Sequence, residues 1–401
     1  MMPFSAFDFL YQTGLAGFVA ILPFFVAGSV YFYRLCMYFT KSAFFSIVGT
    51  LVYILNPYVL YFSATPMMEV LFLSLLVAST YYFVRWIEED YLKYLLIAGI
   101  FFAFAGLARY EGLLLLPVAG VLVLARLFWK RVPYAKIEAI AILFGILAGT
   151  GLLFLMVYSW SFSGHPLAFM GVGDGTNWHM DRPSVESTEF DLYRTLSYLL
   201  HASYYMLSKP LVFLSIPIVF LALALARRRF ASSSALLLLL THLIAIALNM
   251  FRGSSTVMVP EFSALDDFHN VRYALTWITF SAFAIAILPS AILQKWRSWQ
   301  SVALVLCFSI LTLGITITHL YKVAYADRFV VIKSDRSAGE RIKYAERFAY
   351  IENGWKINKE RGNSVAVVLK EKYDFGYILV NRFGNDYLIR ESLLPLKNFI
   401  Y

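Results

Sequence analysis

The chain has 401 residues, of which 60% are hydrophobic and 15% are charged, a composition that excludes an ordinary soluble domain. The formal net charge is +9, but Lys and Arg lie largely in short loops between apolar segments. Orientation in a membrane accounts for such residues, so we do not infer nucleic-acid binding. The apolar runs are continuous and not alternating, which favours membrane-spanning helices over a β-barrel.

About ten apolar segments follow one another along the chain, each close to the ~20 residues that a helix needs to cross a bilayer. The fourth and fifth are short and are separated only by residues 108–111. We therefore predict an all-α polytopic membrane protein with spans at 14–34, 43–63, 67–85, 92–108, 112–128, 138–159, 209–226, 234–251, 274–293 and 301–320.

The loops between these segments alternate between two kinds. One kind is basic, and by the positive-inside bias we place it in the cytoplasm, although it also contains the acidic run 88–90. Its basic residues are Arg34, Lys41, Arg85, Lys93, Arg126, Lys130, Arg131, Lys136, Arg227, Arg228, Arg229, Lys295 and Arg297. The other kind carries nearly all the Asp, Glu, His and Trp outside the spans. We expect a multi-pass cell-membrane protein whose N-terminus and C-terminal tail are both extracytoplasmic.

This alternation divides the chain into two parts. Residues 1–323 form the predicted membrane domain, with extracytoplasmic loops at 160–208 and 252–273. Residues 324–401 form a small extracytoplasmic α/β appendage, with amphipathic helices at 334–350 and 364–372 and a short buried strand at 377–380. An extracytoplasmic N-terminus without an export signal leads us to expect that the chain is incomplete or begins at a late methionine.

Ionisable and aromatic side chains gather at the extracytoplasmic ends of the spans. Because such residues are expensive near a bilayer and often mark sites, we regard them as candidates for binding. They are Glu69 at the start of the third span, Arg109 and Glu111 between the fourth and fifth, His165, Asp174 and Trp178 in loop 160–208, and His269 and Arg272 before the ninth.

Each candidate also has a structural interpretation. Glu69 suits the first turn of a helix, where the macrodipole favours a carboxylate, and this role is about as well supported as a site role. Arg109 and Glu111 can pair with each other or extend to the interface, but the short connection between their spans favours function. Arg272 is extracytoplasmic against the positive-inside trend, which favours anion binding. Trp178 is suited equally to sugar stacking and to a buried anchor.

These residue types match the needs of a lipid-phosphate ligand. An arginine can bind the phosphate at the membrane surface. A carboxylate can act as general base on an acceptor hydroxyl when a sugar is transferred. A divalent metal ion can assist by neutralising the phosphate leaving group.

Five segments, in the same order along the chain, resemble motifs of GT-C-fold integral-membrane glycosyltransferases, the relatives of protein O-mannosyltransferases and lipid-A aminoarabinose transferases. Each motif alone is weak, but five in order are moderately specific. They are Thr65–Phe72, similar to a span start with S-x-x-x-E-x-L-F; Gly106–Pro117, similar to G-x-x-x-R-x-E-G-x-x-x-x-P but with two residues and not three between the first glycine and the arginine; Ser163–Phe169, similar to G-x-P-L-x-F; His269–Tyr273, similar to x-x-R-Y; and Tyr373–Leu379, similar to the start of the tail in archaeal members.

The resemblance implies a GT-C-like fold and a hexosyltransferase that takes a sugar from a polyprenyl- or dolichyl-phosphate donor at the outer leaflet. The partners would be this donor, membrane lipids and an acceptor that is a protein, a glycolipid or a polymer. Together with the positions of the polar residues, it favours substrate binding by Arg109, Glu111, His165, Trp178, His269, Arg272 and Tyr273.

The chain departs from this family at one point. The family's catalytic Asp or Glu lies in the first outer loop, whereas only Asp8 precedes the first span here, and it does not match that motif. We therefore expect the catalytic base upstream of Met1, with Glu69 and Asp174 as weak candidates within the chain. The tail is also shorter than in relatives.

Two other functions stay open. A catalytically inactive GT-C-like scaffold subunit would explain the missing acidic loop. A lipid or solute transporter is less favoured, because the middles of the spans carry almost no charge and show no repeat. The main exception is His242, for which we expect a packed, hydrogen-bonded side chain.

Overall fold

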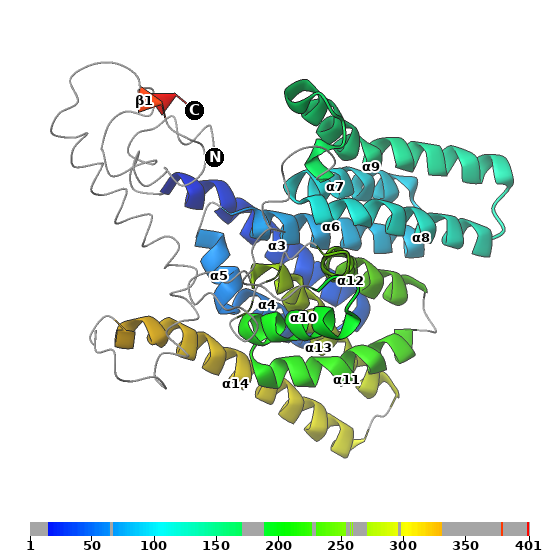
Figure 1. The fold of residues 1–401 in the computed structure, drawn as a ribbon. Helices are drawn as coiled ribbons and strands as arrows, with labels where there is room; N and C mark the ends of the chain where they lie inside the picture. Colours follow the sequence, from blue (N-terminus) through cyan, green and yellow to red (C-terminus); the bar gives the residue numbers. More distant parts are fainter. Residues whose placement is uncertain are drawn as a thin grey trace.

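The computed structural model describes residues 15–64, 67–170, 188–226, 230–253, 257, 259, 271–295, 298–330, 378–379 and 399–400. Almost all of these residues are helical (Figure 1). The elements are α3 (Leu15–Thr40), α4 (Ala43–Ile54), α5 (Pro57–Ala64), α6 (Met68–Glu89), α7 (Leu92–Ala108), η1 (Tyr110–Leu114), α8 (Leu115–Trp129), α9 (Tyr134–Ser163), η2 (Ala168–Met170), α10 (Leu192–Leu207), α11 (Lys209–Ala226), α12 (Phe230–Phe251), η5 (Arg272–Ala274), α13 (Thr276–Lys295), α14 (Trp299–Val330), β1 (Ile378–Leu379) and β2 (Phe399–Ile400).

The chain is an all-α polytopic membrane protein, as the sequence predicts. Among the described residues, seven helices are long and apolar enough to cross a membrane, and an eighth span forms if α4 and α5 count as one. Each of the ten predicted segments coincides with a helix or with this pair. Two of them, α7 and the Lys209–Ile218 part of α11, are apolar but shorter. Ten complete crossings therefore stay a prediction.

Helices α4 and α5 meet at an angle of 62°, a break that the sequence analysis does not predict. The break is built from Asn56 and Pro57. The Asn56 side chain accepts hydrogen bonds from the backbone N–H groups of Tyr58 (3.0 Å) and Val59 (3.3 Å), which caps α5. Pro57 occupies the first position of α5, where its missing N–H has no cost. The Asn56 amide also donates to the Met206 carbonyl (2.8 Å) and so ties the break to α10.

Buried and lipid-facing helices are clearly separated. Helices α6 and α13 are largely buried, whereas α9 and α14 expose large apolar side chains such as Phe154 and Ile310. Helix α6 packs against α3 and α7, and α7 packs against α9, so that α6 to α9 lie side by side (Figure 1). Apolar faces exposed over whole helices fit a lipid surrounding and not water.

Small residues allow the closest helix contacts. A Cβ atom added at Gly49 of α4 would lie 2.6 Å from the Ala286 Cβ of α13, and one added at Gly151 of α9 would collide with the Ala103 carbonyl oxygen of α7. Association of helices in lipid depends on such close packing, because lipid tails are as apolar as the side chains. Gly145 and Gly149 on α9 face open space.

The acidic run in a predicted cytoplasmic loop is paired with neighbouring basic side chains. Arg85 donates to both carboxylate oxygens of Glu89 at 2.7 and 2.8 Å. Asp90 contacts Lys130 and lies 3.5 Å from Arg126. These acids therefore balance part of the positive charge at that end of α6 and α8.

Three features extend the sequence-based description. Helix α10 lies within loop 160–208, where we expected only a loop. Helix α14 continues past residue 323, where we place the end of the membrane domain, to Val330. In the tail, Ile378–Leu379 pairs in parallel with Phe399–Ile400, within the expected strand at 377–380. The helices expected at 334–350 and 364–372 lie outside the described residues.

Candidate functional site

Glu69 lies in the first turn of α6, which begins directly after the extended residue Met67. Its side chain is only 5% exposed. The helix dipole favours a carboxylate at this position, but the carboxylate also faces two arginines from distant segments. The structural and the binding interpretations of Glu69 are therefore compatible.

Arg109 and Glu111 are placed by the sharp turn between α7 and η1. Helix α7 ends at Ala108, Arg109 is extended, and the backbone N–H of Gly112 donates to the Arg109 carbonyl at 2.9 Å. A Cβ atom at Gly112 would lie 2.6 Å from the Ala105 carbonyl oxygen, so only glycine allows η1 to pack this closely on α7. The turn brings the two charged side chains to the same side.

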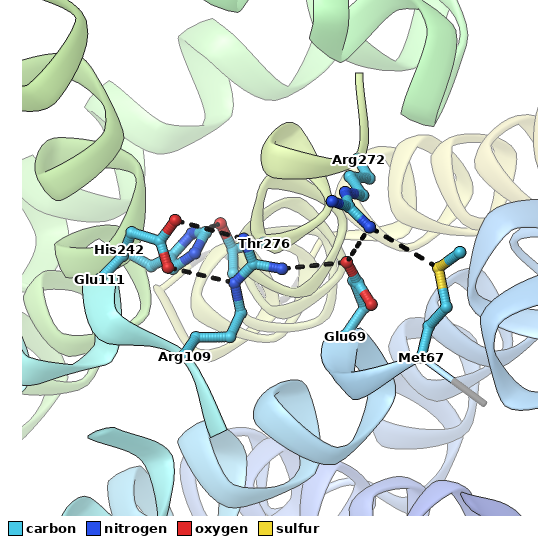
Figure 2. A network of polar contacts seen from close by, with 7 residues as sticks. All are labelled: Met67, Glu69, Arg109, Glu111, His242, Arg272 and Thr276. Atoms are coloured by element: carbon cyan, nitrogen blue, oxygen red, sulfur yellow. Dashed lines mark hydrogen bonds and ion pairs between the residues drawn. The ribbon is translucent and has the colours of Figure 1, made fainter. Parts of the chain in front are cut away.

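The guanidinium of Arg109 is held between two carboxylates (Figure 2). Its Nη1 donates to Glu69 Oε1 at 3.0 Å, while Nε and Nη2 donate to the two oxygens of Glu111 at 3.3 and 3.2 Å. Its Cζ also lies 4.6 Å from the centre of the Tyr273 ring. Bidentate pairing of this kind fixes an arginine in orientation as well as position.

Arg272 opens η5 and contacts the same carboxylate from the other side (Figure 2). Its Nη1 lies 3.4 Å from Glu69 Oε1 and donates to the sulfur of Met67 at 3.8 Å. The Tyr273 ring lies beneath it, with 5.6 Å from Cζ to the ring centre. We call Glu69, Arg109, Glu111, Arg272 and Tyr273 the arginine–glutamate cluster.

Within the cluster, Arg272 differs from the other charged residues in exposure. Its side chain is 39% exposed, compared with 11% for Arg109 and 12% for Glu111. Burial disfavours the charged form of Arg109, but Glu111 and Glu69 outweigh it, and the pKa of the guanidinium lies above its ordinary value. The two arginines and two glutamates have a formal net charge of zero. Because Arg272 is the most exposed of the four, an anion from solvent would reach the cluster through its guanidinium.

His242 of α12 extends the polar contacts toward the interior of the bundle. Its ring is buried, its Nδ1 lies 3.0 Å from the Thr276 hydroxyl of α13, and its Nε2 has no hydrogen-bond partner in the described part of the chain. This confirms the expectation of a packed, hydrogen-bonded histidine. Figure 2 shows it beside Glu111, a proximity that no sequence signal indicates, because the two residues belong to distant helices.

The remaining predicted site residues do not join the cluster in the described structure. His165 is exposed after the end of α9, and its Nδ1 accepts a local hydrogen bond from the Leu167 N–H at 3.2 Å. Asp174, Trp178 and His269 lie outside the described residues. Within the described ranges, no group of three His, Cys, Asp or Glu side chains is placed to hold a metal ion.

Comparisons of the chain with protein-family models, with curated proteins and with solved structures give no match. We therefore infer the function from the residues of this chain and from their geometry.

Proposed function

We propose that the protein is a membrane glycosyltransferase, which moves a sugar from a polyprenyl- or dolichyl-phosphate donor to an acceptor at the extracytoplasmic face. The observation that carries the proposal is that Arg109 and Arg272 both contact one oxygen of the buried Glu69 carboxylate. Both arginines lie at helix ends, which we place at the membrane surface where a lipid phosphate would lie.

In this proposal the arginines have different roles. Arg272 is the exposed cation that binds the donor phosphate, because a guanidinium offers paired N–H donors to phosphate oxygens. Arg109 is a positioning residue, since its three contacts with Glu69 and Glu111 keep it in place. Glu69 orients both arginines, and Tyr273 supports them from one side.

The transfer step requires a general base for the acceptor hydroxyl and a cation that stabilises the phosphate leaving group. The acceptor hydroxyl gives its proton to a general base, and its oxygen forms a bond to the anomeric carbon of the sugar. The bond from that carbon to the phosphate oxygen breaks, and the lipid phosphate leaves with the electron pair. Arg272 would stabilise the negative charge of this leaving group.

Neither glutamate of the cluster is well placed to be the base. Glu69 Oε1 contacts two guanidiniums, and both oxygens of Glu111 accept from Arg109. These contacts favour a role in holding the arginines. We therefore place the base outside the described residues, where Asp174 also lies.

The proposal can be tested with the purified full chain in proteoliposomes that contain a radiolabelled polyprenyl-phosphate hexose and a membrane extract as acceptor. We expect label to move to the acceptor, and Arg272→Gln to abolish the transfer. The matched control is Arg252→Gln, which removes an exposed arginine outside the cluster, in a loop that is predicted to be extracytoplasmic.

Three results would contradict the proposal. Equal transfer by both variants would exclude the assigned role of Arg272. Donor binding without turnover would identify a scaffold, and counterflow of the donor without a transfer product would identify a transporter.

A further inference from the structure

We propose that a groove between α11 and α14 binds the phosphate headgroup of an anionic glycerophospholipid from the surrounding bilayer. The groove shares no residue with the arginine–glutamate cluster, and the inference does not depend on the proposed transferase activity. Helices α11 and α14 contact each other (Figure 1), and residues of both helices line the groove.

The groove has the size and walls of a lipid site. Its volume is about 590 Å³, within the range of small-molecule sites. One wall is a single face of α14, because its residues recur at intervals of three and four. Gly314 leaves this wall open, since a Cβ added there would meet no atom within 4 Å. The lining residues are Ser208, Lys209, Pro210, Leu311, Gly314, Ile315, Thr318, His319, Lys322 and Val323.

The groove is lined by two cationic side chains and by an unsatisfied hydroxyl. Lys209 and Lys322 both line it, and neither forms an ion pair with a carboxylate in the described part of the chain. The Lys209 ammonium lies 5.7 Å from the centre of the Tyr204 ring. The Ser208 hydroxyl oxygen is buried and has no hydrogen-bond partner among the described residues. Buried polar atoms normally have a partner, so this oxygen indicates a missing one.

A phosphodiester satisfies these groups together. Its oxygens accept from two lysine ammonium groups and from a hydroxyl, and lysines near a bilayer surface attract anionic lipids. The acyl chains can then follow Leu311 and Ile315 along α14, a face that is open to the bilayer. The groove therefore offers cationic side chains to the lipid headgroup and apolar side chains to the acyl chains.

The lining also indicates that the lipid is held and not converted. Among the described residues, no aspartate or glutamate lines the groove to act as general base for glycosyl transfer. The buried His319 packs with its ring 6.3 Å from that of Tyr58, on the protein side of the groove. We therefore assign the groove to a phospholipid and not to the sugar donor.

The test is native mass spectrometry of the full chain released from nanodiscs of phosphatidylcholine and phosphatidylglycerol. We expect the wild type to retain phosphatidylglycerol, and the Lys209→Gln/Lys322→Gln variant to retain about 10- to 30-fold less, from two lysine–headgroup attractions. Gly314→Leu should reduce retention without any change in charge. The matched control is Lys41→Gln/Lys136→Gln, which removes the same charge from predicted cytoplasmic loops.

The two kinds of variant keep the proposal testable if one of them fails to fold, which a thermal unfolding curve would show. Unchanged retention in the folded lysine variant, or an equal loss in the control, would overturn the proposal. Preferential retention of undecaprenyl phosphate over phosphatidylglycerol that is lost in Lys209→Gln/Lys322→Gln would overturn the assignment to a phospholipid, because retention at the arginine–glutamate cluster does not depend on these two lysines.

Discussion

At the scale of single residues, the cluster depends on Arg109. Its guanidinium lies between the buried carboxylate of Glu69 and the partly buried carboxylate of Glu111, and no other cation in the described structure contacts Glu111. When one member of a buried ionic group is removed, the free energy of unfolding falls by far more than the intact group contributes to it, because the remaining buried charges lose their partner.

Arg109→Gln should therefore lower the free energy of unfolding by roughly 3–5 kcal/mol. Arg109→Lys should restore little of the loss, because a single ammonium cannot reproduce the paired contacts with Glu111 and the contact with Glu69. Thermal unfolding of the purified protein in detergent measures both. Arg194→Gln is the control, since its ion pair with Asp191 is largely exposed and should contribute less than about 1 kcal/mol. Equal melting temperatures for the Arg109 and Arg194 variants would contradict this account.

His242 allows a second test at this scale. Thr276→Val removes the partner of a buried imidazole nitrogen and should cost about 1–3 kcal/mol. In the double variant Thr276→Val/His242→Phe no polar group is left without its partner, so the loss should be smaller than the sum of the two single losses. Strict additivity in a double-mutant cycle would show that the hydrogen bond contributes little.

At the scale of the elements, close contact between α7 and α9 helps to position Arg109. Gly151→Ala would place a methyl group against the Ala103 backbone and push α9 away from α7. We expect it to lower stability by about 1–3 kcal/mol. Gly149→Ala on the same helix faces open space and should be close to neutral or slightly stabilising. Thermal unfolding curves of the two variants measure this difference in stability. A similar effect of both variants would exclude tight packing at Gly151.

The elements also show what the sequence can and cannot predict. Long apolar runs predict the spans well, since burial in lipid requires continuous apolar length. The search for long apolar runs does not find helix α10, because this helix is amphipathic and lies in a polar loop. The sequence does contain one signal for it, since Asp191 is a typical N-cap residue and its carboxylate accepts a hydrogen bond from the Arg194 N–H at 2.9 Å. For the site, the unusual charges at span ends predict the members of the cluster. Their partners depend on helix packing, which periodicity alone does not determine.

At the scale of the whole molecule, orientation follows from the alternation of basic and polar loops and awaits a direct test. Single cysteines can be introduced in a variant that lacks Cys36 and Cys307. Tyr193→Cys, in a loop predicted to be extracytoplasmic, should react with a membrane-impermeant maleimide in intact cells. Lys136→Cys should react only after permeabilisation. The reverse pattern would invert the topology and place the arginine–glutamate cluster on the cytoplasmic face.

In the function that we propose, the arginine–glutamate cluster binds the phosphate of a lipid-linked sugar donor. Photo-crosslinking with a polyprenyl phosphate that carries a photoreactive group next to the phosphate tests it most directly. We predict labelled peptides that contain residues 67–72, 109–114 or 271–277, and loss of this label in Arg272→Gln. Labelling confined to other segments, such as the groove between α11 and α14, or labelling that Arg272→Gln does not change, would contradict the claim.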